Sequence, residues 1–338
     1  MNCPSVKTVS IQMSVVALIF ILVVLGVLWG ETKKMEGNRT VTDVMLSCFK
    51  IVVGFYQVIS AVYTSFTRVH WPSILVQLAK YIHYVELNIL QVSSFKCLNN
   101  NFDVDYIDRF VFNCLANVAV VALVLVYMVV RRKYMHKRHM SQASINHMKS
   151  NCYRNIFLFL FTTYPMTCAT IINVLPPGCR KLCFDQSQRY CEQYLGSDLS
   201  IHCFTHRHNK YWHLALLAAA YPLGFPLLIV YLIWRYYYKP LKDRMSGELP
   251  EAEGDYIRFA SSPDPGRRGA MAQALSLFYE NYRKECWYWE MLEMIRKLIL
   301  TCGLIFVGSH SRTQIGVGAI LAAAFTILHV YLKPIRNK

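Results

Sequence analysis

The feature that most constrains this chain is a series of long apolar runs, each close to the length of a membrane-spanning helix. A helix needs about 20 residues to cross a hydrocarbon layer about 30 Å thick. Runs of roughly that length lie at residues 13–30, 43–66, 109–130, 153–176, 211–238, 289–308 and 313–332. Since 54% of the residues are hydrophobic and only 17% are charged, we expect an all-α, polytopic bundle of transmembrane helices.

The net charge of +16 raises the question of a nucleic-acid partner. The cations do not form a stripe interleaved with aromatic rings; they gather at the ends of apolar runs. One group contains no acidic residue and lies between two runs: Arg131, Arg132, Lys133, Lys137, Arg138, Lys149 and Arg154. Such basic loops are typical of the cytoplasmic side of a membrane. We therefore expect the lipid bilayer as the partner, with this loop beside anionic lipid, and no nucleic acid.

Placing residues 131–152 in the cytoplasm orients the segments that follow. By alternation, a cysteine-rich loop at 177–210 is extracellular and a loop at 239–286 is cytoplasmic. Basic residues after the first run place 31–42 inside and the amino terminus outside. The segment 73–93 is then an interfacial amphipathic helix, and the chain has seven spans. If 73–93 crosses the membrane instead, there are eight spans and the amino terminus is inside.

Five cysteines lie in predicted outer loops, which face an oxidising compartment where disulfides persist. These disulfide candidates are Cys97, Cys179, Cys183, Cys191 and Cys203. The sequence leaves their pairing open. Zinc is the alternative, because His202, His206 and His208 lie beside Cys203, but no Cys-x-x-Cys pair supports it. We favour disulfides and expect the outer histidines to be surface residues.

Two apolar runs contain a tyrosine–proline step. Pro165 lies in the run at 153–176, and Pro222, Gly224 and Pro226 lie in the run at 211–238. Proline inside a helix removes a backbone hydrogen bond and leaves a carbonyl that a neighbour must satisfy. These residues indicate either a hinge with a cation-facing carbonyl or a fixed kink. Because proline is common in membrane helices, the fixed kink is favoured.

The run at residues 278–297 mixes aromatic rings with charges and leads directly into an apolar segment. Its aromatic residues Trp287, Tyr288 and Trp289 are of the kind that lies at the headgroup level of a membrane. The charged residues that follow can share one helical face and pair locally. They are Glu290, Glu293, Arg296 and Lys297.

This charged group has two interpretations. The favoured one is a salt-bridge cluster that sets the depth of the helix. The other is a gating latch or a site for a cation or a lipid headgroup. Calcium is the one cofactor considered, and it would need further oxygen ligands, for which Asp43 and Gln57 are candidates. No enzyme is expected, because GxSxG, HExxH, Walker and GxGxxG motifs do not occur.

Several blocks of the chain occur in the order found in a known family. These blocks are residues 50–60, 71–72, 194–203, 221–226, 278–283, 287–290 and 296–298. They resemble the membrane region that ends many large eukaryotic surface proteins. That region is similar to the transient-receptor-potential-like domain of fungal flavin-carrier and polycystin-type proteins. The resemblance covers residues 3–338, and its last blocks are the most specific.

The resemblance implies a multi-pass, channel-like protein of the plasma membrane that conducts or senses cations. A homo-oligomer is compatible with such a role. Relatives carry a large ectodomain and further hydrophobic helices after 313–332, so a pore built from those helices would need more than this chain. Two alternatives stay open. One is a seven-helix receptor, for which DRY and NPxxY motifs are missing. The other is a membrane anchor or scaffold for a missing ectodomain.

Overall fold

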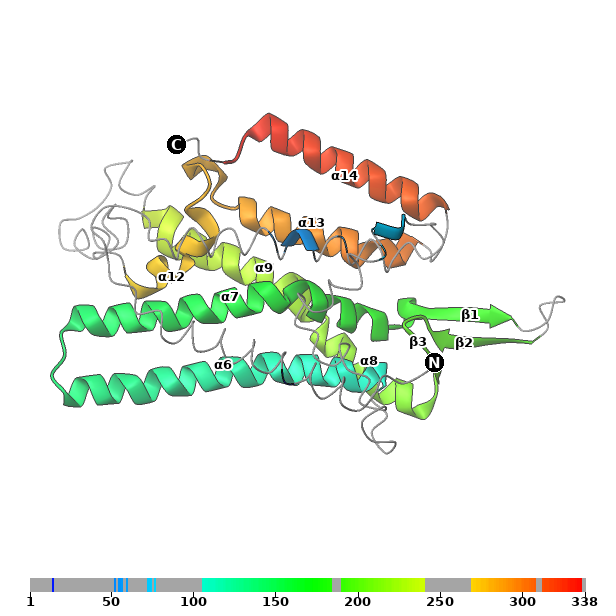
Figure 1. Cartoon of the computed structure of the whole chain (residues 1–338), viewed down its shortest axis with the longest axis horizontal. Helices are drawn as coiled ribbons and strands as arrows, with labels where there is room; N and C mark the ends of the chain where they lie inside the picture. The colour runs from blue at the N-terminus through cyan, green and yellow to red at the C-terminus, as the bar shows by residue number, and fades with distance from the viewer. Residues whose placement is uncertain are drawn as a thin grey trace. The chain divides into compact units, whose positions relative to one another are not determined.

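The computed structural model describes residues 105–183, 190–240, 269–307 and 312–335, with a few isolated positions before residue 105. Over these residues the chain is mostly helical, as the sequence predicts, with one small sheet (Figure 1). Three predicted segments, apart from isolated positions, and one cysteine lie outside the described residues: 13–30, 43–66, 73–93 and Cys97.

Four helical segments of the described chain are long and apolar enough to cross a membrane. They are Tyr106–Lys137, Gln142–Val174, His206–Tyr238 and Thr313–Leu332. Each overlaps one of the predicted runs, although Gln142–Val174 begins eleven residues before the run predicted at 153–176. Of their most apolar windows, 56% of residues are buried in Gln142–Val174 but only 6% in Tyr106–Lys137 and in Thr313–Leu332. Few residues of Tyr106–Lys137 and Thr313–Leu332 are therefore buried in the protein, as expected for apolar helices in contact with lipid.

The run expected to span the membrane at 289–308 is divided in the structure. It forms helix α13 (Trp289–Thr301) and a 3₁₀ segment, η5 (Gly303–Val307). Thirteen α-helical residues rise about 20 Å, which is less than the thickness of a bilayer core. The described residues therefore support four spans by length and composition, and the count of seven stays a prediction.

The chain forms two compact units, which are described separately. The first contains Pro165–Leu216 and Leu300–Gly318 with the described residues up to Asn113. It includes the start of α6 (Tyr106–Lys137), the end of α7 (Gln142–Val174), most of α8 (His206–Ala218) and the start of α14 (Arg312–Leu332). Its buried residues include Ile107, Phe110, Ile171, Leu195 and Ile201.

The predicted outer loop in this unit contains a three-stranded antiparallel sheet, which an all-α prediction did not include. The 3₁₀ turn η1 (Pro176–Gly178) leads into β1 (Cys179–Cys183), β2 (Cys191–Leu195) and β3 (Asp198–His202). Gly178 is required in this turn, because a Cβ there would lie 2.1 Å from the carbonyl oxygen of Asn173. The paired strands satisfy their own backbone groups, which lets a loop that follows a long helix remain compact.

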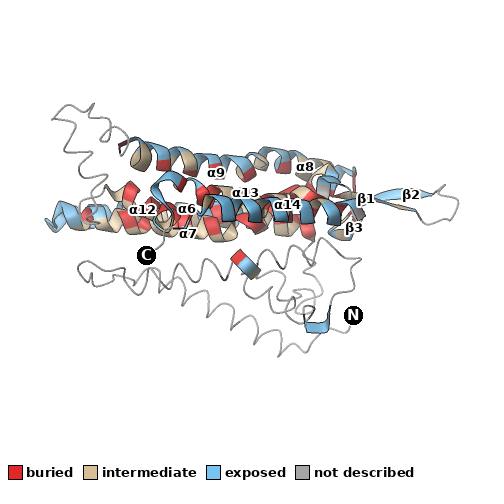
Figure 2. Ribbon diagram, turned by 90° about the horizontal axis from the view of Figure 1, so that it is seen from above, coloured by how far each residue is buried: buried red, intermediate tan, exposed pale blue. Residues whose placement is uncertain are grey.

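The second unit contains Cys114–Tyr164, Leu217–Ile299 and Ala319–Lys338. Its parts of α6 and α7 form a helical hairpin (Figure 1). Within it, Thr163 donates a hydrogen bond to Asn117 at 3.0 Å. Helix α9 (Ala220–Ile233) continues into a π-helical turn, η2 (Trp234–Tyr238). Along α9, buried residues alternate with exposed apolar ones (Figure 2).

The loop predicted at 239–286 also contains helices. Helix α12 (Ala270–Tyr279) and the 3₁₀ turn η4 (Lys284–Cys286) precede α13. Helix α12 is apolar on one face and packs beside α9 and η2. The ring of Tyr279 stacks on that of Tyr237 in η2, with centroids 3.9 Å apart. Phe278, at the end of α12, is fully buried in the core of this unit.

Candidate functional site

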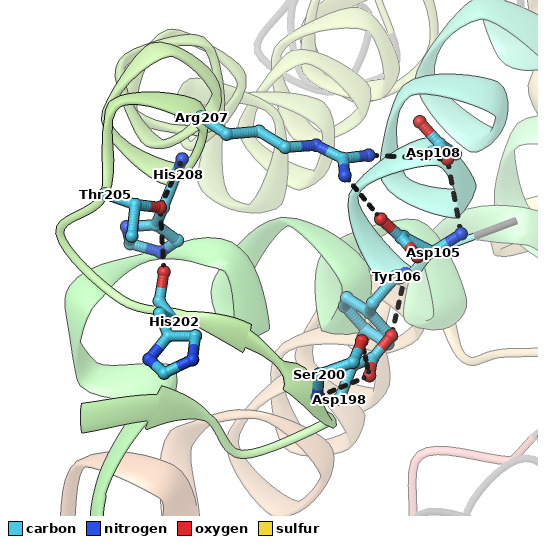
Figure 3. Close-up of polar contacts among 9 residues, drawn as sticks. All are labelled: Asp105, Tyr106, Asp108, Asp198, Ser200, His202, Thr205, Arg207 and His208. Atoms are coloured by element: carbon cyan, nitrogen blue, oxygen red, sulfur yellow. Dashed lines mark hydrogen bonds and ion pairs between the residues drawn. The ribbon is translucent and has the colours of Figure 1, made fainter. Parts of the chain in front are cut away.

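The amino terminus of α6 is capped by carboxylates from two distant parts of the chain (Figure 3). Asp108 accepts a hydrogen bond from the backbone N–H of Asp105 at 3.2 Å. Asp198, from β3, accepts one from the backbone N–H of Tyr106, also at 3.2 Å. The first N–H groups of a helix have no partner inside it, and negative charge there suits the helix dipole. Asp198 therefore fastens the sheet to the start of α6.

Arg207 joins the start of α8 to two carboxylates at the start of α6, those of Asp105 and Asp108 (Figure 3). Its guanidinium nitrogens lie 2.7 Å from Asp105 Oδ2 and 3.7 Å from Asp108 Oδ2. Because the Arg207 side chain is more than half exposed, these ion pairs contribute little stability by themselves. Their effect is to set the spacing between the two helix ends.

Helix α8 has its own cap at Thr205. The Thr205 hydroxyl accepts a hydrogen bond from the backbone N–H of His208 at 3.4 Å and donates one to the carbonyl of His202 at 3.0 Å. A threonine before the first helical residue is a preferred N-cap because its side chain satisfies one unpaired N–H group. The cap links the end of β3 directly to α8.

His208 lies at the centre of this outer cluster and is fully buried. Its Nδ1 accepts a hydrogen bond from the backbone N–H of Phe204 at 3.3 Å, so Nε2 carries the proton and donates to the carbonyl of Val174 at 3.1 Å. His208 thus connects the end of α7 to the start of α8. The prediction that the outer histidines are surface residues is wrong for His208, because its ring satisfies backbone groups that a buried connection would leave unpaired.

The four cysteines of the loop form two disulfides, which decides the pairing that the sequence left open. Cys179 pairs with Cys203 and Cys183 pairs with Cys191. The second pair links directly opposed positions of β1 and β2. The first pair ties the start of β1 to the residue after β3, beside the ring of His208.

The zinc alternative fits this geometry less well. The sulfurs of Cys179 and Cys203 and a ring nitrogen of His208 lie within 4.8 Å of one another. The sulfurs are bonded to each other, however, and both ring nitrogens already face backbone partners. A zinc bond at Nε2 would move the ring proton to Nδ1, where the Phe204 N–H donates. We therefore interpret the disulfide and His208 as a structural lock.

The charge of Asp198 makes this end of the protein sensitive to acid. Partial burial alone would raise the pKa of Asp198, but hydrogen bonds from Ser200 and Tyr106 and the charge of Arg109 outweigh it and lower the pKa. A carboxylate with a lowered pKa stabilises the fold fully above its unfolded pKa of about 3.9. That contribution is lost as the pH falls through the lower, folded value.

We expect Asp198→Asn to melt at a lower temperature than wild type at neutral pH, with the difference disappearing under acid. The effect should be less than about 1 kcal/mol, because the group is largely solvated. Thermal melts of the detergent-solubilised protein between pH 3 and pH 7 would measure it. Glu285→Gln, which removes a carboxylate that is 73% exposed, is the control and should show no such difference. A pH-independent effect of Asp198→Asn would contradict this role.

The second candidate region is the elbow, which we define as residues 278–297. Glu290 is buried near the start of α13 and accepts a hydrogen bond of 2.6 Å from the hydroxyl of Tyr282. Burial and the negative charge of Glu290 raise the pKa of Tyr282, so this hydroxyl stays protonated and keeps donating. A buried carboxylate without such a donor would be costly.

The other predicted charges of the elbow lie close to it. Two nitrogens of Arg296 lie close to Glu293 Oε2, Nε at 2.8 Å and Nη2 at 2.6 Å. This is the ion pair that the i, i+3 spacing predicts. The ammonium of Lys297 lies 5.3 Å from the centre of the Phe161 ring. Calcium would have to displace Arg296 from Glu293, and the further ligands considered, Asp43 and Gln57, lie outside the described residues.

The three predicted interfacial aromatics differ in their surroundings. Trp287 stacks on Tyr238 of the π-helical turn, and Tyr288 is partly exposed. Trp289 is only 2% exposed and meets His329 of α14 edge to face. Trp289 is therefore a core residue, because the start of α13 turns it inward, and it does not point outward to the headgroups.

The residues after α14 bind the elbow through the backbone. Tyr282 and Ile335 form an antiparallel bridge, and the N–H of Arg283 donates to the carbonyl of Pro334 at 2.8 Å. The elbow thus contacts η2 through Trp287, α14 through Trp289 and the segment after α14 through Tyr282. A shift of the elbow would have to move all three.

At one of the predicted prolines the freed carbonyl has a partner within the protein. Pro226 has no N–H, so the carbonyl of Pro222, four residues earlier in α9, loses its helical partner. The hydroxyl of Tyr164 donates to that carbonyl. Pro165 is the next residue of α7 after Tyr164. Gly224 is not required by packing, because a Cβ added there would meet nothing within 4 Å. The Pro222 carbonyl therefore faces a tyrosine.

Sequence reasoning missed Asp198, His208, Tyr282 and Tyr164 as organising residues. One signal was available, because the Asp105–Asp108 spacing resembles a capping box before an apolar run. Asp198, His208 and Tyr164 bond to partners 92, 34 and 58 residues away, which no local pattern encodes. Tyr282 bonds to Glu290 only eight residues away, but the turn and 3₁₀ segment between them have no regular spacing that predicts it.

Comparisons of the chain with protein-family models, with curated proteins and with solved structures gave no match. The resemblance to transient-receptor-potential-like membrane regions therefore stays a prediction.

Proposed function

We propose that this chain is a multi-pass, channel-like protein of the plasma membrane that conducts or senses cations, with its elbow as the gating element. The observation that carries the proposal is the position of the elbow. It holds a buried carboxylate, Glu290, and contacts three other segments within the same unit. Buried charge in a membrane protein is expensive and is typical of functional sites.

Two further observations support a membrane role. Four helical segments of the described chain have the length and apolar character of spans, and two of them have few buried residues in their most apolar windows. The cations at the end of α6 are arranged as in a cytoplasmic loop. Together they support a helical bundle whose surface is covered by lipid.

Reconstitution into planar bilayers tests conduction directly. We expect cation currents that respond to calcium, lipid composition or membrane tension. A protein that is folded and inserted but gives no current under any of these conditions would overturn the channel role. Nucleotide exchange on a G protein would then indicate a receptor, and function that survives exchange of the helices for an unrelated span would indicate an anchor.

Replacing Glu293 with glutamine tests the elbow as a gating element. The side chains of Glu293 and Arg296 are 24% and 28% exposed, so the change leaves a partly desolvated guanidinium without its carboxylate. We expect a cost of about 1–2 kcal/mol and a shift of the stimulus needed for half-maximal current.

Glu285→Gln is the matched control for this experiment. It makes the same substitution in the same elbow, at an exposed carboxylate 3.7 Å from Arg283. Its currents and expression should equal those of wild type. If Glu293→Gln behaves like this control, the charged group only holds the helix at its depth and is not part of a gate.

A further inference from the structure

The end of the α6–α7 hairpin exposes five cations within eight residues. We call residues 131–138 the basic tip. All of its cations are exposed: Arg131, Arg132, Lys133, Lys137 and Arg138. The sequence contains no Asp or Glu from residue 109 to residue 184, so neither helix supplies a carboxylate near the tip. Its charge is therefore available to an external anion.

The basic tip begins where the apolar surface of α6 ends. Val126, Val129 and Val130 are all exposed, and Arg131 follows at once. At a rise of 1.5 Å per residue, Lys137 lies about 10 Å along the helix from Val130. That distance is comparable with the screening length of about 8 Å at physiological ionic strength. If the membrane surface lies at Val130, where the apolar side chains end, all five cations lie within the electrostatic range of its charged headgroups.

Tyr134 adds a side chain suited to the headgroup level. Its ring is 48% exposed, and the guanidinium groups of Arg131 and Arg138 lie 5.9 Å and 5.4 Å from its centre. Exposed tyrosine is enriched at membrane interfaces. Planar guanidinium groups bind phosphate oxygens in pairs, which an ammonium group does not.

The tip is also preorganised by the hairpin. Met135 and Ile145 are buried on either side of the turn, and the hydroxyl of Ser141 caps α7 by accepting the N–H of Ser144 at 3.3 Å. The cations therefore stand on a helix that is already formed, and binding need not order a loop.

We infer that the basic tip binds the headgroups of anionic phospholipids in the leaflet that it meets. The inference rests on the proposed placement of this hairpin in a membrane, with the tip on the cytoplasmic side, where anionic lipids are concentrated. A lipid surface fits better than a soluble polyanion, because the charge continues directly from an apolar surface that lipid would cover.

Native mass spectrometry of the full chain in detergent tests this, with phosphatidylserine and phosphatidylcholine of equal acyl chains as probes. We expect wild type to prefer phosphatidylserine and to lose that preference as ionic strength rises. Arg131→Gln/Arg132→Gln should reduce the preference by about fivefold for each charge removed. Lys181→Gln/Lys210→Gln is the matched control, since it removes two exposed cations from the other unit and should leave the preference unchanged.

Equal binding of the two lipids by wild type would overturn the inference. So would an equal loss of preference in both double variants, because the effect would then reflect net charge. Displacement of phosphatidylserine by polyglutamate or an oligonucleotide at the same charge concentration would identify a soluble polyanion as the occupant. A chain that prefers phosphatidylserine but passes no current would overturn the channel role alone, and a conducting chain without the preference would overturn this inference alone.

Discussion

Replacing Cys179 and Cys203 together with serine is expected to destabilise the disulfide-linked sheet by about 3 kcal/mol. This disulfide joins cysteines separated by 24 positions in the sequence, and the segment that it closes contains all of the described sheet. Its loss increases the conformational freedom of the unfolded segment and removes the sulfur that lies beside His208. The start of α8 should loosen with the sheet, because Thr205 and His208 hold both.

Hydrogen–deuterium exchange of the detergent-solubilised protein under non-reducing conditions would measure this effect. We expect faster exchange in β2, β3 and the first turn of α8. Cys183→Ser/Cys191→Ser is the matched control, because its disulfide closes only 8 residues at the far end of the hairpin. Its effect should be smaller and confined to β1 and β2. Unchanged exchange at α8 in the Cys179/Cys203 variant would contradict the proposed lock.

Replacing Phe278 with alanine is expected to cost about 3–5 kcal/mol, enough to lower expression of a marginally stable protein. Phe278 is fully buried, and its ring lies 6.0 Å from that of Phe157 and 5.8 Å from that of Phe161, centre to centre. Truncation would leave a cavity between α7 and α12 and remove these aromatic contacts. The elbow would lose its main apolar attachment to the hairpin.

Thermal unfolding in detergent, followed by tryptophan fluorescence, would check this prediction. Tyr288→Ala is the control, because it removes an aromatic ring from the same elbow at a position that is 38% exposed. It should change the melting temperature much less. Equal effects of the two variants would show that Phe278 does not anchor the elbow.

Several structural features could be predicted from local patterns. The length of the apolar runs predicts the four described spans, because a bilayer needs about 20 apolar residues per helix. The crowding of cysteines in one loop predicts disulfides there, and the spacing of Glu293 and Arg296 predicts their ion pair. Each of these inferences uses only neighbours within a few turns or a few tens of residues.

Other features lay beyond such patterns. The headgroup-level interpretation of Trp289 used residue type alone, whereas burial against His329 depends on a second helix. The sheet was missed because its strands are only five residues long and two of them begin or end at a disulfide cysteine. Such short strands have no periodicity that distinguishes them from a loop.

By itself, the sequence determined the helical character of this protein, the approximate positions of its four long apolar helices and the loop that holds its two disulfides. Hydrophobic length and local spacing are properties of neighbouring residues, so they can be read along the chain. Only the tertiary structure decided that Asp198 caps α6 and that Tyr164 satisfies the carbonyl of Pro222. These partners are 92 and 58 residues apart, and a hydrogen bond forms only when two atoms approach to about 3 Å.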